Sequence, residues 1–191
     1  MNLPALAVLF GLVLVAAIAG FILLASYNAI VGLRQRIDKA WSNIDVVLKQ
    51  RHDQLPNLVA AVRGVMAFER DVLSEVTQAR AAYSPTAPIP AQAVTSEATS
   101  SAIRSLLAVV ERYPDLKSQA NVQSLQDEIE RLEAMIADRR ELYNDQVYRY
   151  NTAIAQVPGI ALASLLGWKA RQFFAAQPDE IVRPDTSLGL S

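Results

Sequence analysis

The stretch that decides the fold is Tyr27–Tyr83, which reads YNAIVGLRQRIDKAWSNIDVVLKQRHDQLPNLVAAVRGVMAFERDVLSEVTQARAAY. Its apolar side chains recur at alternating steps of four and three residues, which is typical of one helix face held against a partner. We therefore predict a single helix over 27–83, roughly 85 Å long, with a bend and no break at Pro56. The positions of this apolar seam are Ile37, Trp41, Ile44, Leu48, Arg51, Leu55, Leu58, Val62, Val65, Glu69, Val72, Val76, Ala79 and Tyr83.

Two of these positions are charged, Arg51 and Glu69, and Arg139 occupies the same kind of position further along the chain. Burying a charge costs several kcal/mol unless it is paired, so one interpretation places a carboxylate or carbonyl of a neighbouring helix beside each. The other interpretation lets each side chain extend to the rim of the seam, where its charged end meets water. The sequence leaves both open.

An apolar run precedes this stretch: Leu3–Ala25 contains no charged residue. Its length matches the roughly 30 Å hydrocarbon core of a bilayer. Ala17-Ile18-Ala19 resembles a signal-peptide cleavage site, but no Lys or Arg precedes the run and the run continues past that site. We therefore expect residues 1–26 to stay as a transmembrane anchor. Its candidate lipid-facing residues are Leu3, Leu9, Val13, Ile18, Phe21 and Leu24.

The charges beside the anchor predict its orientation. Arg34, Arg36 and Lys39 follow it, and no basic side chain precedes it. The positive-inside rule then places the remainder of the chain in the cytoplasm, with the lipid bilayer as its first partner. We expect a single-pass protein of the cell membrane.

The rest of the chain also reads as helical, and no strand alternation competes. Helices are expected over about 95–112, 121–157 and 160–176, with a loop from Ser84 to about Val94 and a disordered tail over 178–191. The class is all-α, with an elongated antiparallel (up-and-down) bundle of about four long helices over 27–177 after the anchor. Near Pro114 the chain either reverses or only kinks, and we favour the reversal.

Tyrosine–asparagine pairs recur at Tyr27-Asn28, Tyr143-Asn144 and Tyr150-Asn151. The last two are one heptad apart, and the apolar seam of their helix shifts phase after Tyr143, which is a stutter. Such pairs either satisfy carbonyls exposed at the stutter or are ordinary core residues, and we favour core packing. The final helix mixes Trp168 with cationic residues, so it either packs on the 27–83 helix, which we favour, or touches the membrane.

Composition excludes several classes of function. Eighteen basic and 19 acidic residues give a net charge of −1, so nothing favours a nucleic-acid partner. The chain has no cysteine and one histidine, which excludes thiolate sites and any two-histidine metal site in one chain. We expect His52 to face solvent. We find no catalytic, cofactor or metal motif and predict that the protein is not an enzyme.

A distributed pattern of residues runs from the anchor to about Ala176: Tyr27-Asn28, Trp41, Arg51, Leu55-Pro56-Asn57-Leu58-Val59, Glu69, Ala79-Arg80, Glu111-Arg112-Tyr113-Pro114-Asp115-Leu116-Lys117, Arg139, Tyr143-Asn144, Tyr150-Asn151 and Pro158. This pattern resembles the LemA family over nearly the whole of that part of the chain. The resemblance implies a bacterial single-pass membrane protein with a bundle of long helices and no known catalytic activity. It also implies a link to membrane biogenesis, through a magnetosome-associated relative, and a gene neighbourhood that often contains membrane metallopeptidases.

These observations predict a non-catalytic scaffold or interaction module at the bacterial cytoplasmic membrane. Its expected partner is an unidentified membrane or cytosolic protein, or a second copy of the chain. The alternatives are a membrane-remodelling or lipid-contacting protein and an accessory of a membrane metallopeptidase. The candidate structural or interaction residues are Arg51, Asn57, Glu69, Arg80, Glu111, Tyr113, Arg139, Tyr143, Asn144, Tyr150 and Asn151.

Overall fold

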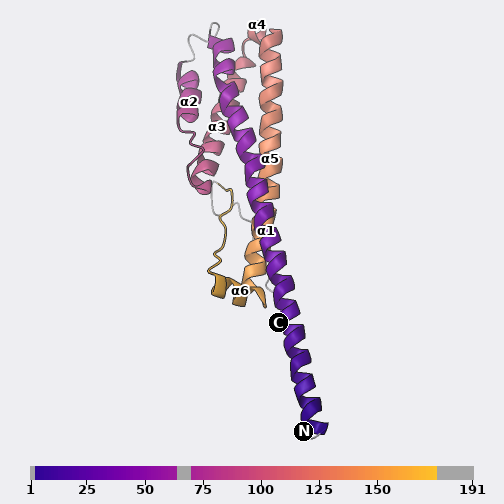
Figure 1. Cartoon of the computed structure of the whole chain (residues 1–191). Helices are drawn as coiled ribbons and strands as arrows, with labels where there is room; N and C mark the ends of the chain where they lie inside the picture. The colour runs from indigo at the N-terminus through magenta and orange to yellow at the C-terminus, as the bar shows by residue number, and fades with distance from the viewer. Residues whose placement is uncertain (1–2, 64–69, 176–191) are drawn as a thin grey trace, which may run out of the picture. The chain divides into compact units, whose positions relative to one another are not determined.

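The computed structural model describes residues 3–63 and 70–175, and all regular secondary structure in these residues is helical, as predicted (Figure 1). The helices are α1 (Leu3–Arg63), α2 (Arg70–Ala81), α3 (Ile89–Val110), α4 (Pro114–Lys117), α5 (Ala120–Ala155) and α6 (Gly159–Leu166).

The chain divides into two compact units. Unit 1 comprises Met1–Ala40 with Asn144–Arg171, and unit 2 comprises Trp41–Tyr143 with Gln172–Ser191. The long helices α1 and α5 each contribute to both units. The boundary predicted after residue 26 lies inside α1 and not at a helix end.

Unit 2 is built from the later part of α1, from α2, α3 and α4, and from the earlier part of α5. The apolar seam predicted for α1 is its buried face, since Ile44, Leu48, Leu55, Leu58 and Val62 are all buried. Apolar side chains of α2, α3, α4 and α5 complete this core. They include Val76, Ala79, Ala102, Ile103, Leu106, Val109, Val110, Leu116, Val122 and Ile129.

The prediction of one helix over 27–83 is wrong. α1 continues through Pro56, as expected, but it ends at Arg63, and α2 packs back beside it. The His52 and Tyr83 rings lie 4.7 Å apart, whereas one straight helix would separate them by about 46 Å. Both helices turn their seam residues toward the same core. The sequence pattern therefore keeps its phase although the chain reverses between them.

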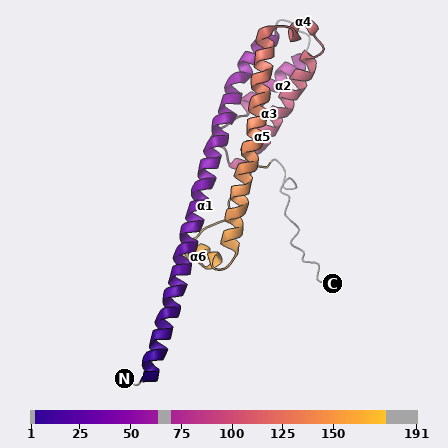
Figure 2. The ribbon, with the colours of Figure 1, turned by 90° about the vertical axis from the view of Figure 1, so that its right-hand side faces the viewer.

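The predicted reversal near Pro114 is confirmed. Ser100 of α3 and Glu133 of α5 are 33 residues apart in sequence, yet their side chains are hydrogen-bonded at 2.6 Å. The single turn of α4 lies between the two helices, with Pro114 in its first turn. Figure 2 shows α3 and α5 side by side in unit 2.

α3 begins earlier than predicted. The segment up to Val94 was expected to be a loop, but the helix begins at Ile89, with Pro90 in its first turn. Proline is tolerated there because the first backbone N–H groups of a helix have no intrahelical acceptor. α5 agrees with the predicted 121–157 helix to within two residues at each end.

Unit 1 contains α6, which is shorter than the predicted 160–176 helix. It ends at Leu166 because Gly167 adopts a left-handed conformation, with φ of 65°, and the Trp168 N–H then bonds the Ala163 carbonyl at 2.9 Å. Residues up to 175 continue without helix. The tail predicted over 178–191 lies outside the described residues.

The N-terminal part of α1 is the one described helix that is long and apolar enough to cross a membrane. Its large apolar side chains are exposed, in contrast to those of the later seam. Of the predicted lipid-facing residues, Leu9, Val13, Ile18, Phe21 and Leu24 are all exposed. The side chain of Leu3 lies outside the described part of the structure.

Candidate functional site

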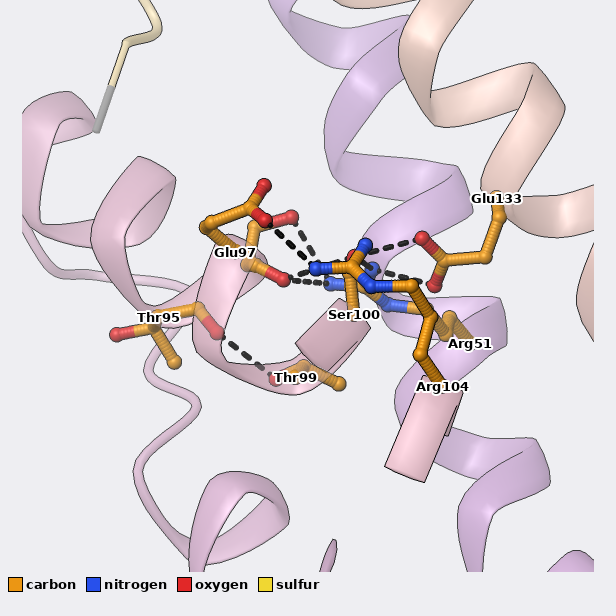
Figure 3. Close-up of polar contacts among 8 residues, drawn as sticks. Arg51, Thr95, Glu97, Thr99, Ser100, Arg104 and Glu133 are labelled. Carbon is orange, nitrogen blue, oxygen red and sulfur yellow. Dashed lines mark hydrogen bonds and ion pairs between the residues drawn. The ribbon is translucent and has the colours of Figure 1, made fainter. Parts of the chain in front are cut away.

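The most elaborate polar arrangement in unit 2 surrounds the buried guanidinium of Arg51, whose side chain is 3% exposed (Figure 3). Its Nη1 donates to Glu133 Oε1 at 2.7 Å and to Ser100 Oγ at 2.8 Å. Its Nη2 donates to Ser96 Oγ at 2.9 Å and to the Ser96 carbonyl at 3.3 Å. Arg51 is therefore paired within the core and does not extend to water, which decides between the two sequence-based interpretations.

Ser100 completes this cluster, which we call the Arg51 cluster (Arg51, Ser96, Ser100 and Glu133). Its hydroxyl lies 2.6 Å from Glu133 Oε2 and 3.1 Å from the Ser96 carbonyl. One carboxylate thus accepts from both α1 and α3. Because every member bonds another, the cost of burying the charge is offset and three helices are held in one register.

The rim of the Arg51 cluster is more exposed. Arg104 and Glu97 form an ion pair at 3.0 Å between two largely exposed side chains. A cavity of about 180 Å³ borders this pair and is lined also by Glu133, Arg140 and Phe174. Exposed pairs contribute little to stability, so the buried Arg51 pair is the structural one.

His52 is half-buried, whereas the sequence predicted that it would face solvent. Its ring lies 4.7 Å from that of Tyr83, and among the described residues its buried Nδ1 has no hydrogen-bond partner. Partial burial, aided by the positive charge of Arg80, lowers the pKa of His52, although Asp53 opposes this. Burial, aided by Asp45 and Asp53, raises the pKa of the Tyr83 hydroxyl. Both shifts favour the neutral form of the group.

Tyr143 is a core residue of unit 2. Its ring packs edge-on against Trp41, with centroids 5.7 Å apart, and Trp41 also contacts Phe174 at 5.8 Å. The Tyr143 hydroxyl donates to the Gln172 carbonyl at 2.9 Å. Core packing, the favoured interpretation, is confirmed for this tyrosine.

In unit 1, Tyr150 and Asn151 hold the segment that follows α6. The buried Tyr150 donates its hydroxyl to the Lys169 carbonyl at 3.2 Å. The Asn151 amide both donates to the Arg171 carbonyl, at 3.0 Å, and accepts from the Arg171 N–H, at 2.8 Å. These groups therefore bond the backbone after α6 and not carbonyls at the stutter, which was the alternative that the sequence left open.

Trp168 packs on α1 within unit 1, as we favoured. Its ring stacks on Tyr27 with centroids 5.7 Å apart, and the Arg34 guanidinium lies 5.6 Å from its centroid. Arg171 also reaches α1, with its Nη2 3.2 Å from Asp38 Oδ1. The C-terminal end of α6 is thereby fixed beside residues 27–38.

The remaining candidate residues do not gather into one site. Asn57 is exposed and donates to Gln54 on its own helix at 3.0 Å. Arg80 is exposed at the edge of a groove of about 280 Å³ between α1 and α2. Arg139 donates to the Asn43 carbonyl at 2.6 Å, so it is bound to a neighbouring helix, as one interpretation proposed.

Three more candidates lie near the α3–α5 connection or on α5. Glu111 is exposed and pairs with Lys117. Tyr113 is half-buried and packs against the core of unit 2. Asn144 is half-buried on α5. Glu69 lies outside the described residues.

Residues 40–187 match the LemA family. The chain belongs to this family. It is also similar to magnetosome protein MamQ 2 of Paramagnetospirillum magneticum (strain ATCC 700264 / AMB-1), with 27% identity over 86% of this chain and 71% of the relative. Magnetosome protein MamQ of Magnetospirillum gryphiswaldense (strain DSM 6361 / JCM 21280 / NBRC 15271 / MSR-1) is 25% identical over 82% of this chain and 67% of the relative.

Sequence reasoning missed three members of the Arg51 cluster in this LemA family protein: Ser96, Ser100 and Glu133. A signal was present. Traced back from Ile103 in helical steps, the apolar stripe of α3 reaches Ser100 and then Ser96. Small polar residues at core positions, opposite a charged residue on the seam of α1, indicate a buried polar contact.

Proposed function

We propose that this LemA family protein is a single-pass protein of the bacterial cytoplasmic membrane that works as a non-catalytic interaction module. The observation that carries the proposal is the continuity of α1. Its first part exposes a run of large apolar side chains, and its later part contributes the buried seam of unit 2. One helix thus joins a membrane-compatible segment to a packed helical unit. This is the arrangement expected of a tethered module.

The basic residues after the apolar run support a cytoplasmic location for the helical units. Arg34 and Arg36 are the first charged residues after the run, and the positive-inside rule retains such residues on the cytoplasmic side. A cysteine-reactive probe that cannot cross membranes tests this orientation, because the chain has no cysteine of its own. A cysteine at exposed Leu142 should be labelled only after the cells are opened.

A non-catalytic role is supported by how the polar groups are used. The guanidinium and carboxylate of the Arg51 cluster bond each other and two serines, so these contacts hold helices together. The buried tyrosines Tyr143 and Tyr150 likewise bond backbone carbonyls. We propose that the protein acts through its surface, on another membrane or cytosolic protein or on a second copy of itself.

Photo-crosslinking in intact cells tests the proposed interaction. A photoreactive residue replaces Val46 or Leu142, two exposed apolar residues of unit 2. We expect a crosslinked species of higher mass in the membrane fraction, and the matched control places the same residue at buried Leu106. A protein that stays monomeric and uncrosslinked at both exposed positions would contradict the proposal.

A lipid-contacting function is the second candidate. The exposed side chains of Ile160, Leu165 and Leu166 on α6 favour it. The chain is similar to a magnetosome protein, MamQ 2, and a MamQ-like role in membrane biogenesis is part of this second proposal. Enrichment of the protein on curved or invaginated membranes would distinguish this function from that of a protein-binding module.

A further inference from the structure

α6 is packed on one side only. Gly159 approaches the other elements of unit 1 so closely that a Cβ there would overlap the Ala153 carbonyl oxygen and lie 3.2 Å from Ile30 Cδ1. Ala163 is buried and Leu162 half-buried on the same face. Contacts with α1 and the end of α5 therefore cover this half of the helix.

The opposite side of α6 is uncovered, and its one polar side chain is that of the exposed Ser164. Leu165 is 83% exposed and Ile160 51% exposed, and Val157, just before the helix, is 87% exposed. No residue of α6 is charged. A helix with no charged residue is normally covered on most of its surface, and a cluster of exposed large apolar residues marks a contact surface.

The position of α6 along α1 indicates what covers this surface. Gly159 lies beside Ile30, and Trp168 stacks on Tyr27, so α6 is beside the first residues after the apolar run (Figures 1 and 2). Leu24 and Ile30 are about 9 Å apart along a helix. The headgroup layer of a leaflet is roughly 5–7 Å thick, so α6 lies at or next to that layer when the run spans the membrane. Tyr27 and Trp168 are the residue types that gather at this depth.

Charge identifies the kind of lipid. The described residues of unit 1 carry six basic side chains against two acidic ones, a net charge of +4 in a chain whose total is −1. Three of these basic residues follow the anchor in sequence. The other three belong to α5 and to the segment after α6, and the fold brings them into the same unit. The basic residues are Arg34, Arg36, Lys39, Arg149, Lys169 and Arg171, and the acidic ones are Asp38 and Asp145.

We propose that α6 is a second membrane contact, which inserts Ile160 and Leu165 at the surface of a leaflet rich in anionic phospholipid while basic residues of unit 1 bind its headgroups. This inference rests on the proposed anchoring by α1. It gives the protein two attachments, one spanning and one interfacial, and it specifies the lipid class that the interfacial one prefers.

Single-cysteine labelling of the full chain tests the proposal, because the native chain has no cysteine. Leu165→Cys carries an environment-sensitive fluorophore, and the protein is placed in nanodiscs of phosphatidylglycerol or of phosphatidylcholine that contain brominated acyl chains. We expect blue-shifted emission and strong quenching in phosphatidylglycerol, and weaker quenching in phosphatidylcholine. Lys169→Gln should reduce the difference between the two lipids.

Two further labels separate the possible outcomes. Leu142→Cys, an exposed leucine of unit 2, is the matched control and should stay unquenched, whereas Leu14→Cys reports on the anchor. Quenching at position 14 without quenching at 165 overturns this inference and leaves the anchoring intact. No quenching at position 14 overturns the anchoring itself. Equal quenching at 142 and 165, or excimers between labels at 165 on two copies, also overturns the assignment of α6 to lipid.

Discussion

Glu133 Oε1 lies 2.7 Å from Nη1 of Arg51, an ion pair between residues 82 positions apart in sequence. Arg51 belongs to α1 and Glu133 to α5, and the serines that share the pair belong to α3. The contact therefore ties three helices of unit 2 together at one level.

Removal of the carboxylate should be costly. Glu133→Ala leaves the guanidinium of Arg51 buried with only serine partners. An uncompensated buried charge costs about 3–5 kcal/mol of stability. Because Glu133 is 29% exposed, water can reach part of the site, and we expect a loss at the lower end of that range. Chemical unfolding of the full chain in detergent micelles measures it.

The double variant Arg51→Met/Glu133→Leu should recover most of this loss, because it removes both charges together. The matched control is Arg149→Ala, which breaks an exposed pair with Asp145 and should leave stability nearly unchanged. If Glu133→Ala unfolds no more easily than Arg149→Ala, the Arg51 cluster does not hold the helices.

Replacement by alanine should have opposite effects on stability at two glycines. Gly159→Ala places a methyl group against the backbone oxygen of Ala153, so α6 must move away and unit 1 should be destabilised. Gly32→Ala meets nothing within 4 Å and lies inside α1, so it should stabilise the helix by about 0.5–1 kcal/mol. Amide hydrogen exchange over α6 and α1 measures both effects. Faster exchange in α6 of the Gly32→Ala variant would be inconsistent with this packing.

The segment after α6 should loosen when its polar contacts are removed. Asn151→Ala deletes two hydrogen bonds to the Arg171 backbone, and Tyr150→Phe deletes one to Lys169, each worth about 1 kcal/mol. Trypsin cleaves after Lys and Arg, so cutting at Lys169 and Arg171 should accelerate, more in Asn151→Ala. Asn57→Ala is the control, since Asn57 bonds only Gln54 on its own helix in the described contacts. Equal cleavage rates in all three variants would argue against this role.

Stability should fall in mild acid because of His52. Its pKa is lowered in the folded protein, so as the pH falls below its ordinary value of about 6.5 the unfolded chain binds a proton first. The free energy of unfolding is therefore unaffected by this group above about pH 6.5 and decreases below it, through the lowered pKa. His52→Gln should flatten the profile between about pH 7 and 5.5, before the carboxylates titrate. The test is clean because the chain has one histidine, and an unchanged slope in the variant would refute it.

Much of unit 2 could be predicted from sequence, because periodicity reports which side chains are buried. The seam of α1 from Ile44 to Val62 is buried as predicted, and so are Ile129, Leu132 and Ile136 on α5. Periodicity does not report chain direction. Val76 and Ala79 are buried seam residues whether the helix continues or reverses, and this is why the α1–α2 reversal was missed.

The polar contacts were harder to predict. Arg51 stood out as a charge on an apolar seam, but Glu133 lies beside its seam and looks like a solvated residue. The end of α6 at Gly167 and the contacts of Tyr150 and Asn151 depend on a backbone turn and on residues about 20 positions away. Local patterns carry no information about such partners.

The proposed function requires the anchor, and intact mass spectrometry of the protein that remains in membranes after alkaline carbonate extraction tests for the anchor directly. We predict that the protein stays in the membrane pellet with the mass of the full chain, 20.9 kDa. A protein recovered in the soluble fraction, or one shortened by cleavage after Ala19, would contradict the central claim.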